Sequence, residues 1–286
     1  MVRPTGEWKI GRRALAFGER TLVMGVLNVT PDSFSDGGQF LSLDEALAHA
    51  EQMIIDGANI IDVGGESTRP GANFVSAEEE LCRVIPVIER LANLPVPISI
   101  DTTKTEVARV ALRAGAEIVN DISGLRFDPE LATVAAEANA GLVLMHSRGT
   151  PKDMQQIPFA ENVLSDVVEG LRISTSIAKE RGVSSEQIAI DPGIGFGKTA
   201  PQNLELIAKL ETIAGEFPGV PILIGTSRKS FLGKILDDAP ADARLYGTIA
   251  TEVAAVLNGA HIVRVHDVKA AVQAAKVVDA LRDASR

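Results

Sequence analysis

Residues 262–275 read IVRVHDVKAAVQAA and contain one complete structural unit. The first four residues form a short β-branched run that predicts a buried strand, and the polar pair His266 and Asp267 ends it. Apolar residues then recur at the spacing of one helical face: Val268, Ala271, Val272 and Ala275. We therefore predict a strand followed directly by a helix, which is one βα unit.

The same alternation repeats along the chain. Eight short apolar runs, each followed by turn residues and a helical pattern, lie at 22–27, 60–63, 98–100, 117–119, 142–145, 187–190, 222–224 and 262–265. Alternating units predict right-handed crossovers and a parallel sheet, and eight of them in about 250 residues favour a closed barrel. We predict an α/β fold, a (β/α)8 TIM barrel that residues 1–286 form as a single domain, with a short N-terminal hairpin at 8–16 capping it.

The second helical stretch holds two residues that need an interpretation. Pro86 lies inside it, so we expect the helix to start late or to kink there. Cys82 lies in the same apolar stretch and is the only cysteine. It excludes an internal disulfide and fits a reducing compartment, and we interpret it as a core residue and not a nucleophile.

Composition excludes several classes of partner. The net charge is −10, which argues against electrostatic capture of nucleic acid or anionic lipid. Aromatic residues make up only 4%, too few for a stacking platform that binds single-stranded nucleic acid. No apolar run approaches the length of a membrane span, and we expect a cytoplasmic protein.

Polar residues gather where the predicted strands end. They are Asn28, Gly64 to Arg69, Asp101, Asn120 with Asp121, His146, Asp191, Thr226 to Lys229, and Arg264 to Asp267. The carboxyl ends of barrel strands meet at one face, where active sites lie. We therefore predict one shared site, and we expect the two long loops at 29–43 and 64–76 to cover its substrates.

The glycine-rich stretch DPGIGFGKT at 191–199 fits no common nucleotide motif. Pro192 occupies the position where a Walker A loop needs glycine, and Lys198 occupies the last glycine position of the dinucleotide fingerprint. The four histidines do not have metal-site spacing. We interpret His49 as a helix-surface residue, His261 as a strand-entry residue and His146 as a loop-packing residue.

Seven motifs in fixed order resemble the dihydropteroate synthase family of pterin-binding TIM barrels. They are NVTPDSFSDGG at 28–38, DVGGESTRPG at 62–71, SIDT at 99–102, NDI at 120–122, DPG at 191–193, SRK at 227–229 and RVHD at 264–267. Each motif is short, but their order on successive strands is specific. The resemblance extends from Met24 to about Val268.

The resemblance implies a transferase of folate biosynthesis. Such an enzyme condenses p-aminobenzoate with 6-hydroxymethyl-7,8-dihydropterin diphosphate, giving 7,8-dihydropteroate and pyrophosphate with Mg²⁺ as cofactor. It also implies ionisation of the pterin diphosphate before arylamine attack, a homodimer, and inhibition by sulfonamides. Resistant relatives carry an insertion near the phenylalanine that corresponds to Phe196, and this chain has none.

The resemblance assigns roles to individual residues. It places the pterin against Asp101, Asn120, Met145, Asp191 and Lys229, and p-aminobenzoate against Thr68, Arg69, Pro70, Phe196 and Ser227. It places pyrophosphate and the first loop at Asn28, Phe34, Asp36, Arg69, Arg264 and His266, with Mg²⁺ at Asn28. The residues implied in catalysis are Asp101, Lys229, Arg264 and His266.

Two other functions stay open. Pterin-dependent methyltransferases share the Asp-Asn-Asp pterin pocket, but are not expected to carry the first-loop, SRK or RVHD motifs. A non-catalytic paralogue would bind pterin without turnover, although every position that the resemblance requires is intact here.

Overall fold

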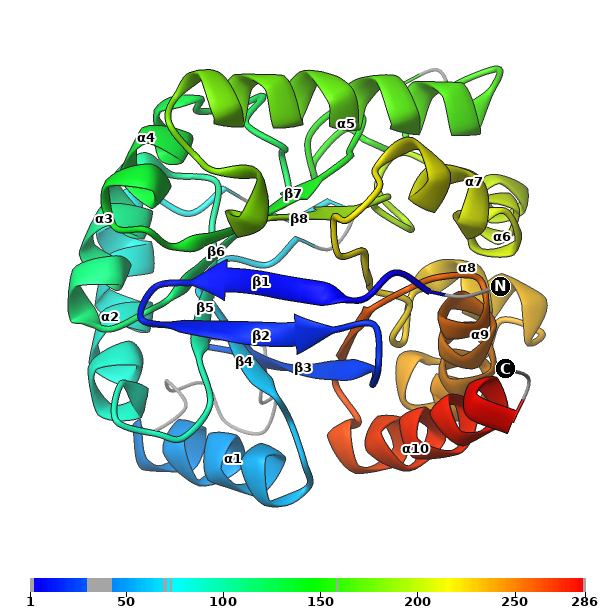
Figure 1. The fold of residues 1–286 in the computed structure, drawn as a ribbon, viewed down its shortest axis with the longest axis horizontal. Coiled ribbons are helices and arrows are strands. Elements are labelled where there is room, and N and C mark those ends of the chain that lie inside the picture. Colours follow the sequence, from blue (N-terminus) through cyan, green and yellow to red (C-terminus); the bar gives the residue numbers. More distant parts are fainter. Residues whose placement is uncertain (1–2, 30–42, 69–70, 73, 158, 285–286) are drawn as a thin grey trace.

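The computed structural model describes residues 3–29, 43–68, 71–72, 74–157 and 159–284. Eight parallel strands form one sheet in the order β8-β7-β6-β5-β4-β3-β10-β9 (Figure 1). They are β3 (Leu22–Asn28), β4 (Ile60–Gly64), β5 (Ile98–Asp101), β6 (Ile118–Asp121), β7 (Gly141–Met145), β8 (Ile188–Asp191), β9 (Leu223–Ile224) and β10 (Ile262–Val265). A parallel bridge between Ile190 and Ile222 joins the two ends of this order. The predicted barrel is confirmed.

Helices surround the strands and bury one face each against them (Figure 1). They are α1 (Leu43–Ile55), α2 (Ala77–Leu91), α3 (Thr105–Ala114), α4 (Glu130–Glu137), α5 (Val163–Glu180), α6 (Ala200–Ala208), α7 (Leu210–Glu216), α8 (Ser230–Ile235), α9 (Leu245–Leu257) and α10 (Val268–Ala284). In α10, Val268, Ala271 and Ala275 are buried, as the helical period predicts. The main core lies between this helical ring and the strands.

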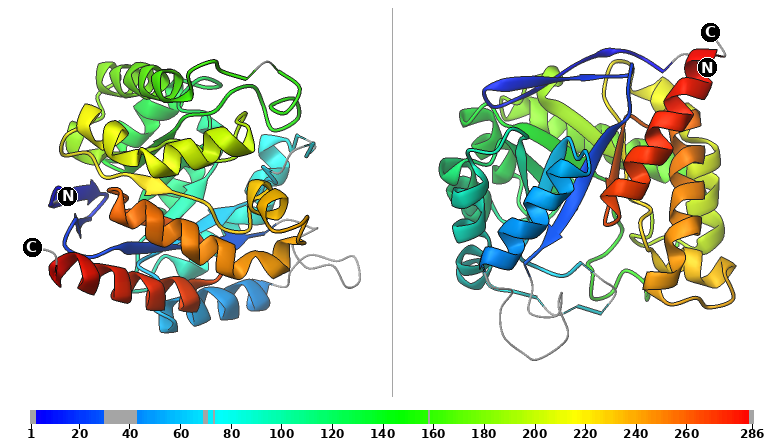
Figure 2. Two further views of the ribbon diagram at one scale, coloured as in Figure 1. Left: turned by 90° about the vertical axis from the view of Figure 1, so that its right-hand side faces the viewer. Right: turned by 90° about the horizontal axis from the view of Figure 1, so that it is seen from below.

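An antiparallel hairpin of β1 (Gly6–Ile10) and β2 (Arg13–Phe17) closes the amino end of the barrel (Figure 2). Trp8 and Ile10 are fully buried in a second core with the inward residues of the barrel strands. The indole Nε1 of Trp8 donates to the carbonyl of Gln187 at 2.8 Å. Gly141 permits this packing, because a Cβ there would lie 2.5 Å from Cγ2 of Ile10. The predicted capping hairpin is confirmed.

For the second helical stretch, the late start that was one of two expectations at Pro86 and the buried position of Cys82 are both wrong. α2 does not start late: it begins at Ala77, where the Ser76 side chain accepts from the Glu79 amide at 3.2 Å. Pro86 lies inside it on the solvent side, where its missing N–H leaves a carbonyl that water can reach. Cys82 is exposed and not a core residue. The predicted kink at Pro86 stays a prediction.

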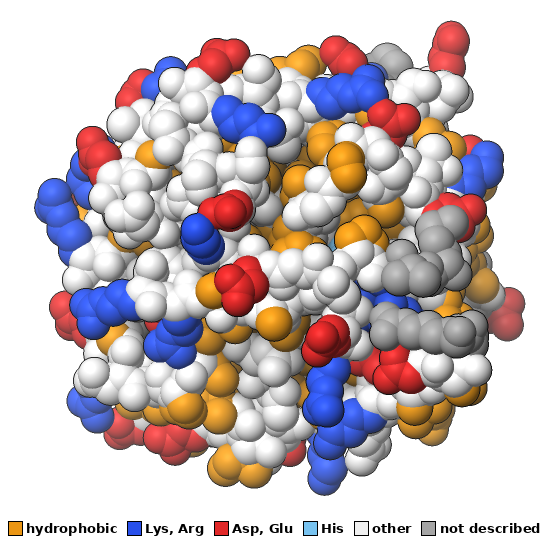
Figure 3. All heavy atoms as spheres, viewed as in Figure 1, with side chains coloured by type: hydrophobic (Ala, Val, Ile, Leu, Met, Phe, Trp, Pro, Cys, Tyr) orange, Lys and Arg blue, Asp and Glu red, His pale blue; other side chains and the backbone are white. Residues whose placement is uncertain are grey.

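The face of the molecule that carries the hairpin mixes charges of both signs (Figure 3). Basic and acidic side chains alternate across it, so this face offers no broad basic patch to a polyanion. No helix within the described ranges is both long enough and apolar enough to cross a membrane.

Candidate active site

Four strand ends stand side by side at the carboxyl end of the barrel. The register pairs Asn28 of β3 with Gly64 of β4, Gly64 with Asp101 of β5, and Asp101 with Asn120 of β6. A Cβ on Gly64 would lie 3.6 Å from both Oδ1 of Asn28 and Cβ of Asp101. The glycine therefore leaves the space between these two polar side chains open. The strands extend one or two residues beyond the predicted runs and include these polar positions.

Arg264 connects three of the strands. From β10 its Nε donates to Oδ2 of Asp62 at 2.6 Å, and its Nη2 donates to Oδ2 of Asp101 at 2.7 Å. Asn120 donates its side-chain amide to the same oxygen of Asp62 at 3.0 Å. The guanidinium is thus held on two carboxylates, with its remaining N–H groups available to other acceptors.

Burial sets the protonation of this network. It raises the pKa of Asp101 to about 7, against the opposing charge of Arg264 and with the support of Asp62. Burial lowers the pKa of Arg264, but the carboxylates of Asp62 and Asp101 outweigh it and raise that pKa. The guanidinium therefore stays charged, and its charge favours the ionised form of Asp101 against the effect of burial.

Sequence reasoning missed Asp62. It lies in the middle of β4, is fully buried, and holds both Arg264 and Asn120. Its motif was noted, but no role was predicted for it. The available signal was a charged residue inside an otherwise apolar strand, because a buried carboxylate requires a cation or hydrogen-bond donors.

Asp191, at the end of β8, and Lys229, at the start of α8, form a second charged group. Asp191 ends β8 and accepts from the Gly193 amide at 2.7 Å. Burial raises its pKa, and Lys229 opposes that rise. Burial also lowers the pKa of Lys229 to about 8, although Asp191 opposes the change. Met145 pairs with Asp191 in the sheet register, which brings this apolar side chain beside the carboxylate strand.

Lys198, for which no role was predicted, holds the glycine-rich loop in place. Its Nζ is buried and donates to the carbonyls of Gly193 (2.8 Å), Phe196 (3.1 Å) and His146 (3.2 Å). Burial lowers the pKa of Lys198 to about 7, against the opposing charge of Asp191. The glycine-rich stretch at 191–199 is therefore a turn that Lys198 holds in place. It presents Phe196 to Lys229, whose Nζ lies 4.7 Å from the ring centroid.

The loop after β9 and the end of β10 are joined by two pairs of side chains. The hydroxyl of Ser227 lies 3.0 Å from Nδ1 of His266. The guanidinium of Arg228 donates to both carboxylate oxygens of Asp267, at 2.9 and 2.5 Å. This second pair lets Arg228 adopt a left-handed backbone with φ of 57°. Ser227, Lys229 and His266 are thereby presented at the same end of the barrel.

Some of the predicted site residues lie in the loops after β3 and β4. Phe34, Asp36, Arg69 and Pro70 lie outside the described residues, as does most of the first long loop. Thr68 is half-buried in the loop after β4.

The three histidines given non-catalytic roles behave as predicted. His146 is buried against α5, with its Nε2 3.3 Å from Oδ2 of Asp166, and burial lowers its pKa to about 4. His49 is exposed on α1, and His261 is buried just before β10.

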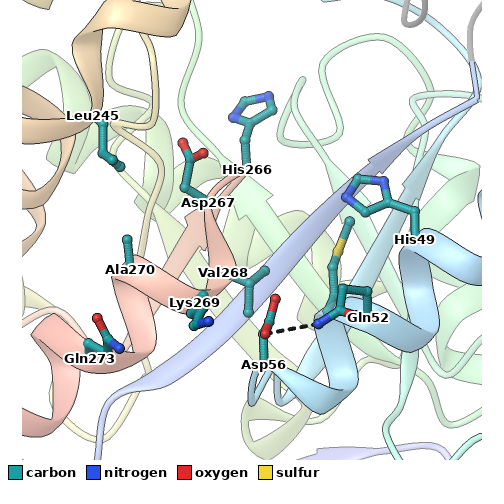
Figure 4. A pocket seen from close by; sticks show the side chains of 11 residues that line it. His49, Gln52, Asp56, Leu245, His266, Asp267, Val268, Lys269, Ala270 and Gln273 are labelled. Atoms are coloured by element: carbon teal, nitrogen blue, oxygen red, sulfur yellow. Dashed lines mark hydrogen bonds between the residues drawn. The ribbon is translucent and has the colours of Figure 1, made fainter.

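A cavity of about 370 Å³ lies between α1 and α10 (Figure 4). Its lining includes His49 and Gln52 from α1, Asp56 just after α1, and His266 and Lys269. Asp101 and Asp191 do not line it. This cavity therefore lies between two outer helices and meets the predicted site at His266.

No cluster of three or more His, Cys, Asp or Glu side chains suited to a metal ion occurs within the described ranges. A Mg²⁺ ion bound here would therefore take few of its ligands from the protein. Asn28 offers a hard amide oxygen beside the open space over Gly64. Because Mg²⁺ commonly binds one or two protein oxygens together with substrate phosphates and water, this donor fits an ion that binds with a diphosphate.

Comparisons with known proteins find related sequences and structures. The model of a family described as pterin binding enzyme matches residues 24–266. The chain is 54% identical over 269 residues to dihydropteroate synthase of Bacillus subtilis (strain 168), covering 94% of this chain and 91% of that relative. It is 51% identical over 273 residues to dihydropteroate synthase of a Synechocystis species, covering 95% and 94%.

Solved structures show the same similarity. Dihydropteroate synthase of Yersinia pestis, described with a sulfonamide drug complex, has a TM-score of 0.90 and 41% identity, covering 98% of this chain and 100% of that chain. Dihydropteroate synthase of Burkholderia cenocepacia, complexed with 7,8-dihydropteroate, has a TM-score of 0.87 and 43% identity, covering 98% of each chain.

Proposed function

Because this chain belongs to the dihydropteroate synthase family of pterin-binding enzymes, we propose that it joins p-aminobenzoate to 6-hydroxymethyl-7,8-dihydropterin diphosphate. The reaction forms a C–N bond to the pterin methylene, breaks its C–O bond to diphosphate, and yields 7,8-dihydropteroate and pyrophosphate. The observation that carries this proposal is the convergence of buried acceptors with the cations Arg264 and Lys229 at one end of the barrel.

The acceptors suit a pterin. Its ring edge presents adjacent N–H donors, and the buried carboxylate of Asp191 can accept two of them in parallel. Asn120 can donate and accept at the neighbouring edge. Met145, buried beside Asp191 in register, supplies an apolar wall. Asp101 lies on the far side, where its negative charge stabilises a cationic pterin methylene.

The cations suit the leaving group. Diphosphate gains negative charge as the C–O bond breaks, and Arg264 is already oriented by Asp62 and Asp101 to meet that charge. His266 adds a donor, held in place by Ser227. Proton balance is simple: the arylamine nitrogen is neutral when it attacks and loses one proton to solvent afterwards. Ionisation before attack therefore requires no dedicated general base.

Asn28 is the residue that would hold Mg²⁺. The ion, when bound, would supply Lewis-acid neutralisation of the diphosphate oxygens. Arg264 lies on the neighbouring strand, since β10 pairs with β3, and would share the same negative charge.

The p-aminobenzoate subsite is the proposed neighbour of the pterin pocket. Thr68, Phe196 and Ser227 lie on three loops at the carboxyl end of the barrel. Lys229 lies over the Phe196 ring and so connects this subsite to Asp191. Arg69 and Pro70 belong to the same proposal, although they lie outside the described residues. A benzene ring against Phe196, with its carboxylate at Ser227, would leave the amine facing the pterin methylene.

A homodimer is also part of the proposal. Exposed apolar side chains occur on α6 and on α8 and α9, which both contact α6. They are Leu204, Ile235, Tyr246 and, just after α8, Leu236. Such a group of exposed apolar residues is typical of protein interfaces. Sedimentation of the purified protein would measure the oligomeric state. A cytoplasmic location, proposed from the single cysteine, would be tested by fractionation of the source cells.

The function is tested by product analysis. Purified protein with Mg²⁺, the dihydropterin diphosphate and p-aminobenzoate should form 7,8-dihydropteroate, identified by mass spectrometry, and a sulfonamide should compete with p-aminobenzoate. Tight pterin binding without product would indicate a non-catalytic paralogue. Absence of both binding and product would contradict the proposed function.

A further inference from the structure

A buried ionic cluster outside the substrate pocket joins the Thr68 loop to the barrel. Lys104 lies just after β5, and its Nζ contacts Oε2 of Glu66 and Oε2 of Glu80, each at 2.5 Å. Glu66 belongs to the loop after β4, and Glu80 lies on α2 with its side chain fully buried. Three separate elements therefore meet at one ammonium group.

The second carboxylate oxygen of Glu66 closes the loop on itself. Oε1 of Glu66 accepts from the amide of Val75 at 3.1 Å, so residues 66 and 75 are held together across nine positions. Phe74 packs over the same lysine, with the ring centroid 4.8 Å from Nζ. Thr68 lies within the segment that this bond encloses.

The start of the loop is fixed to α2 as well. A Cβ on Gly65 would lie 2.7 Å from Cγ1 of Val84, so the backbone approaches the helix more closely than any other residue permits. Arg83 donates to the carbonyl of Gly65 at 2.7 Å. The Lys104 contact also links the loop to the segment that directly follows β5, the strand that ends at Asp101.

Charge and burial favour a persistent link. The Lys104 side chain is 13% exposed and the Glu66 side chain 22%. Burial lowers the pKa of Lys104, but the hydrogen bonds to Glu66 and Glu80 outweigh it and raise that pKa. The lysine therefore stays charged across the physiological range, and bonds of this kind are stronger than neutral ones.

We propose that Lys104 and Glu66 are positioning residues for the p-aminobenzoate subsite, because their ion pair fixes the Thr68 loop against α2 and the end of β5. The inference rests on the proposed function. Neither residue touches the reacting atoms. The expected consequence is selective. Loss of the pair should weaken p-aminobenzoate binding, whereas the pterin affinity should be kept, because Asn120, Met145 and Asp191 lie on β6, β7 and β8, away from the cluster.

Glu66→Ala is the informative variant, since Lys104→Met would leave the fully buried Glu80 without its cation. Glu66→Ala removes both the bond to Lys104 and the bond to the Val75 amide. It should raise the KM for p-aminobenzoate at least about tenfold and leave kcat within about twofold. The calorimetric affinity for dihydropterin diphosphate should not change. Arg109→Met is the matched control, because it removes an exposed ion pair between Arg109 of α3 and Glu137 of α4.

A double variant makes the test specific. If Lys104 acts through Glu66, Lys104→Met combined with Glu66→Ala should raise the KM for p-aminobenzoate by less than the product of the two single effects. An active wild-type enzyme whose Glu66→Ala variant keeps its KM would overturn this inference and leave the proposed function intact. A wild-type protein that forms no product would overturn both.

Discussion

At its amino end the barrel is closed by apolar side chains such as Trp8, whereas at its carboxyl end the same strands carry buried charges such as Asp62 and Arg264. Burial of apolar surface stabilises the fold directly. Burial of ion pairs contributes little net stability, because desolvation of the charges opposes their attraction. The contrast indicates that one end is built for stability and the other for binding and chemistry.

Trp8→Ala tests the stability of the amino end most directly. The change removes a fully buried indole and its bond to Gln187, and should lower the free energy of unfolding by about 3–5 kcal/mol. Denaturant unfolding would measure the loss, with Leu15→Ala on the half-buried part of the same hairpin as a milder control. At a temperature where the variant is folded, kcat should match the wild type. A large fall in kcat there would contradict the division between the two ends.

Arg264→Ala is the corresponding change at the carboxyl end. Loss of one pre-oriented cation at the departing diphosphate should cost about 2.7–4 kcal/mol of transition-state stabilisation, which is about two to three orders of magnitude in turnover. Steady-state pyrophosphate release would measure it. Arg172→Ala, which removes an exposed pair with Glu216 on the outer surface, should leave turnover unchanged. Near-normal turnover of Arg264→Ala would exclude the proposed role.

A smaller effect, on the pH dependence of stability, is expected from the buried carboxylate of Glu252 on α9. Both of its carboxylate oxygens are buried without a hydrogen-bond partner in the described part of the chain. Burial, supported by the charge of Asp267, raises the pKa of Glu252 from 4.5 to about 8. The folded protein therefore holds a proton that the unfolded chain releases above pH 4.5. The free energy of unfolding is therefore not reduced by Glu252 below pH 4.5. It falls as the pH rises from 4.5 to about 8, because the unfolded chain gives up the Glu252 proton more easily than the folded protein.

The Glu252→Gln variant keeps the shape without this titration. Between about pH 5 and about pH 9 the wild type should lose at least about 1 kcal/mol more of its free energy of unfolding than the variant. Denaturant midpoints at several pH values would show the difference, and Glu51→Gln on exposed α1 is the control. Parallel pH profiles for Glu252→Gln and wild type would show that Glu252 is not held protonated by the fold.

The sequence alone predicts the barrel well because its strands are buried on both faces. Apolar runs mark each strand, and polar residues such as Asn28 and Asp191 mark their carboxyl ends. Asp62 was missed because its partner Arg264 is 202 residues away, a separation that no local pattern reveals.

Helix α2 shows the other limit. Its capping residue Ser76 fixes the start of the helix, and this local signal outweighs the proline inside it. The exposed face that carries Cys82 is decided by how the helix packs, which spacing alone did not resolve.

The central claim, that the charged end of the barrel binds the pterin, is tested most directly by calorimetric titration of dihydropterin diphosphate into wild type and Asp191→Asn. The asparagine presents an N–H where the ring presents its own donors, so affinity should fall about 100-fold. Asp56→Asn, in the half-buried turn just after α1, should bind like the wild type. Unchanged affinity in a folded Asp191→Asn protein would contradict the account and place the pterin elsewhere.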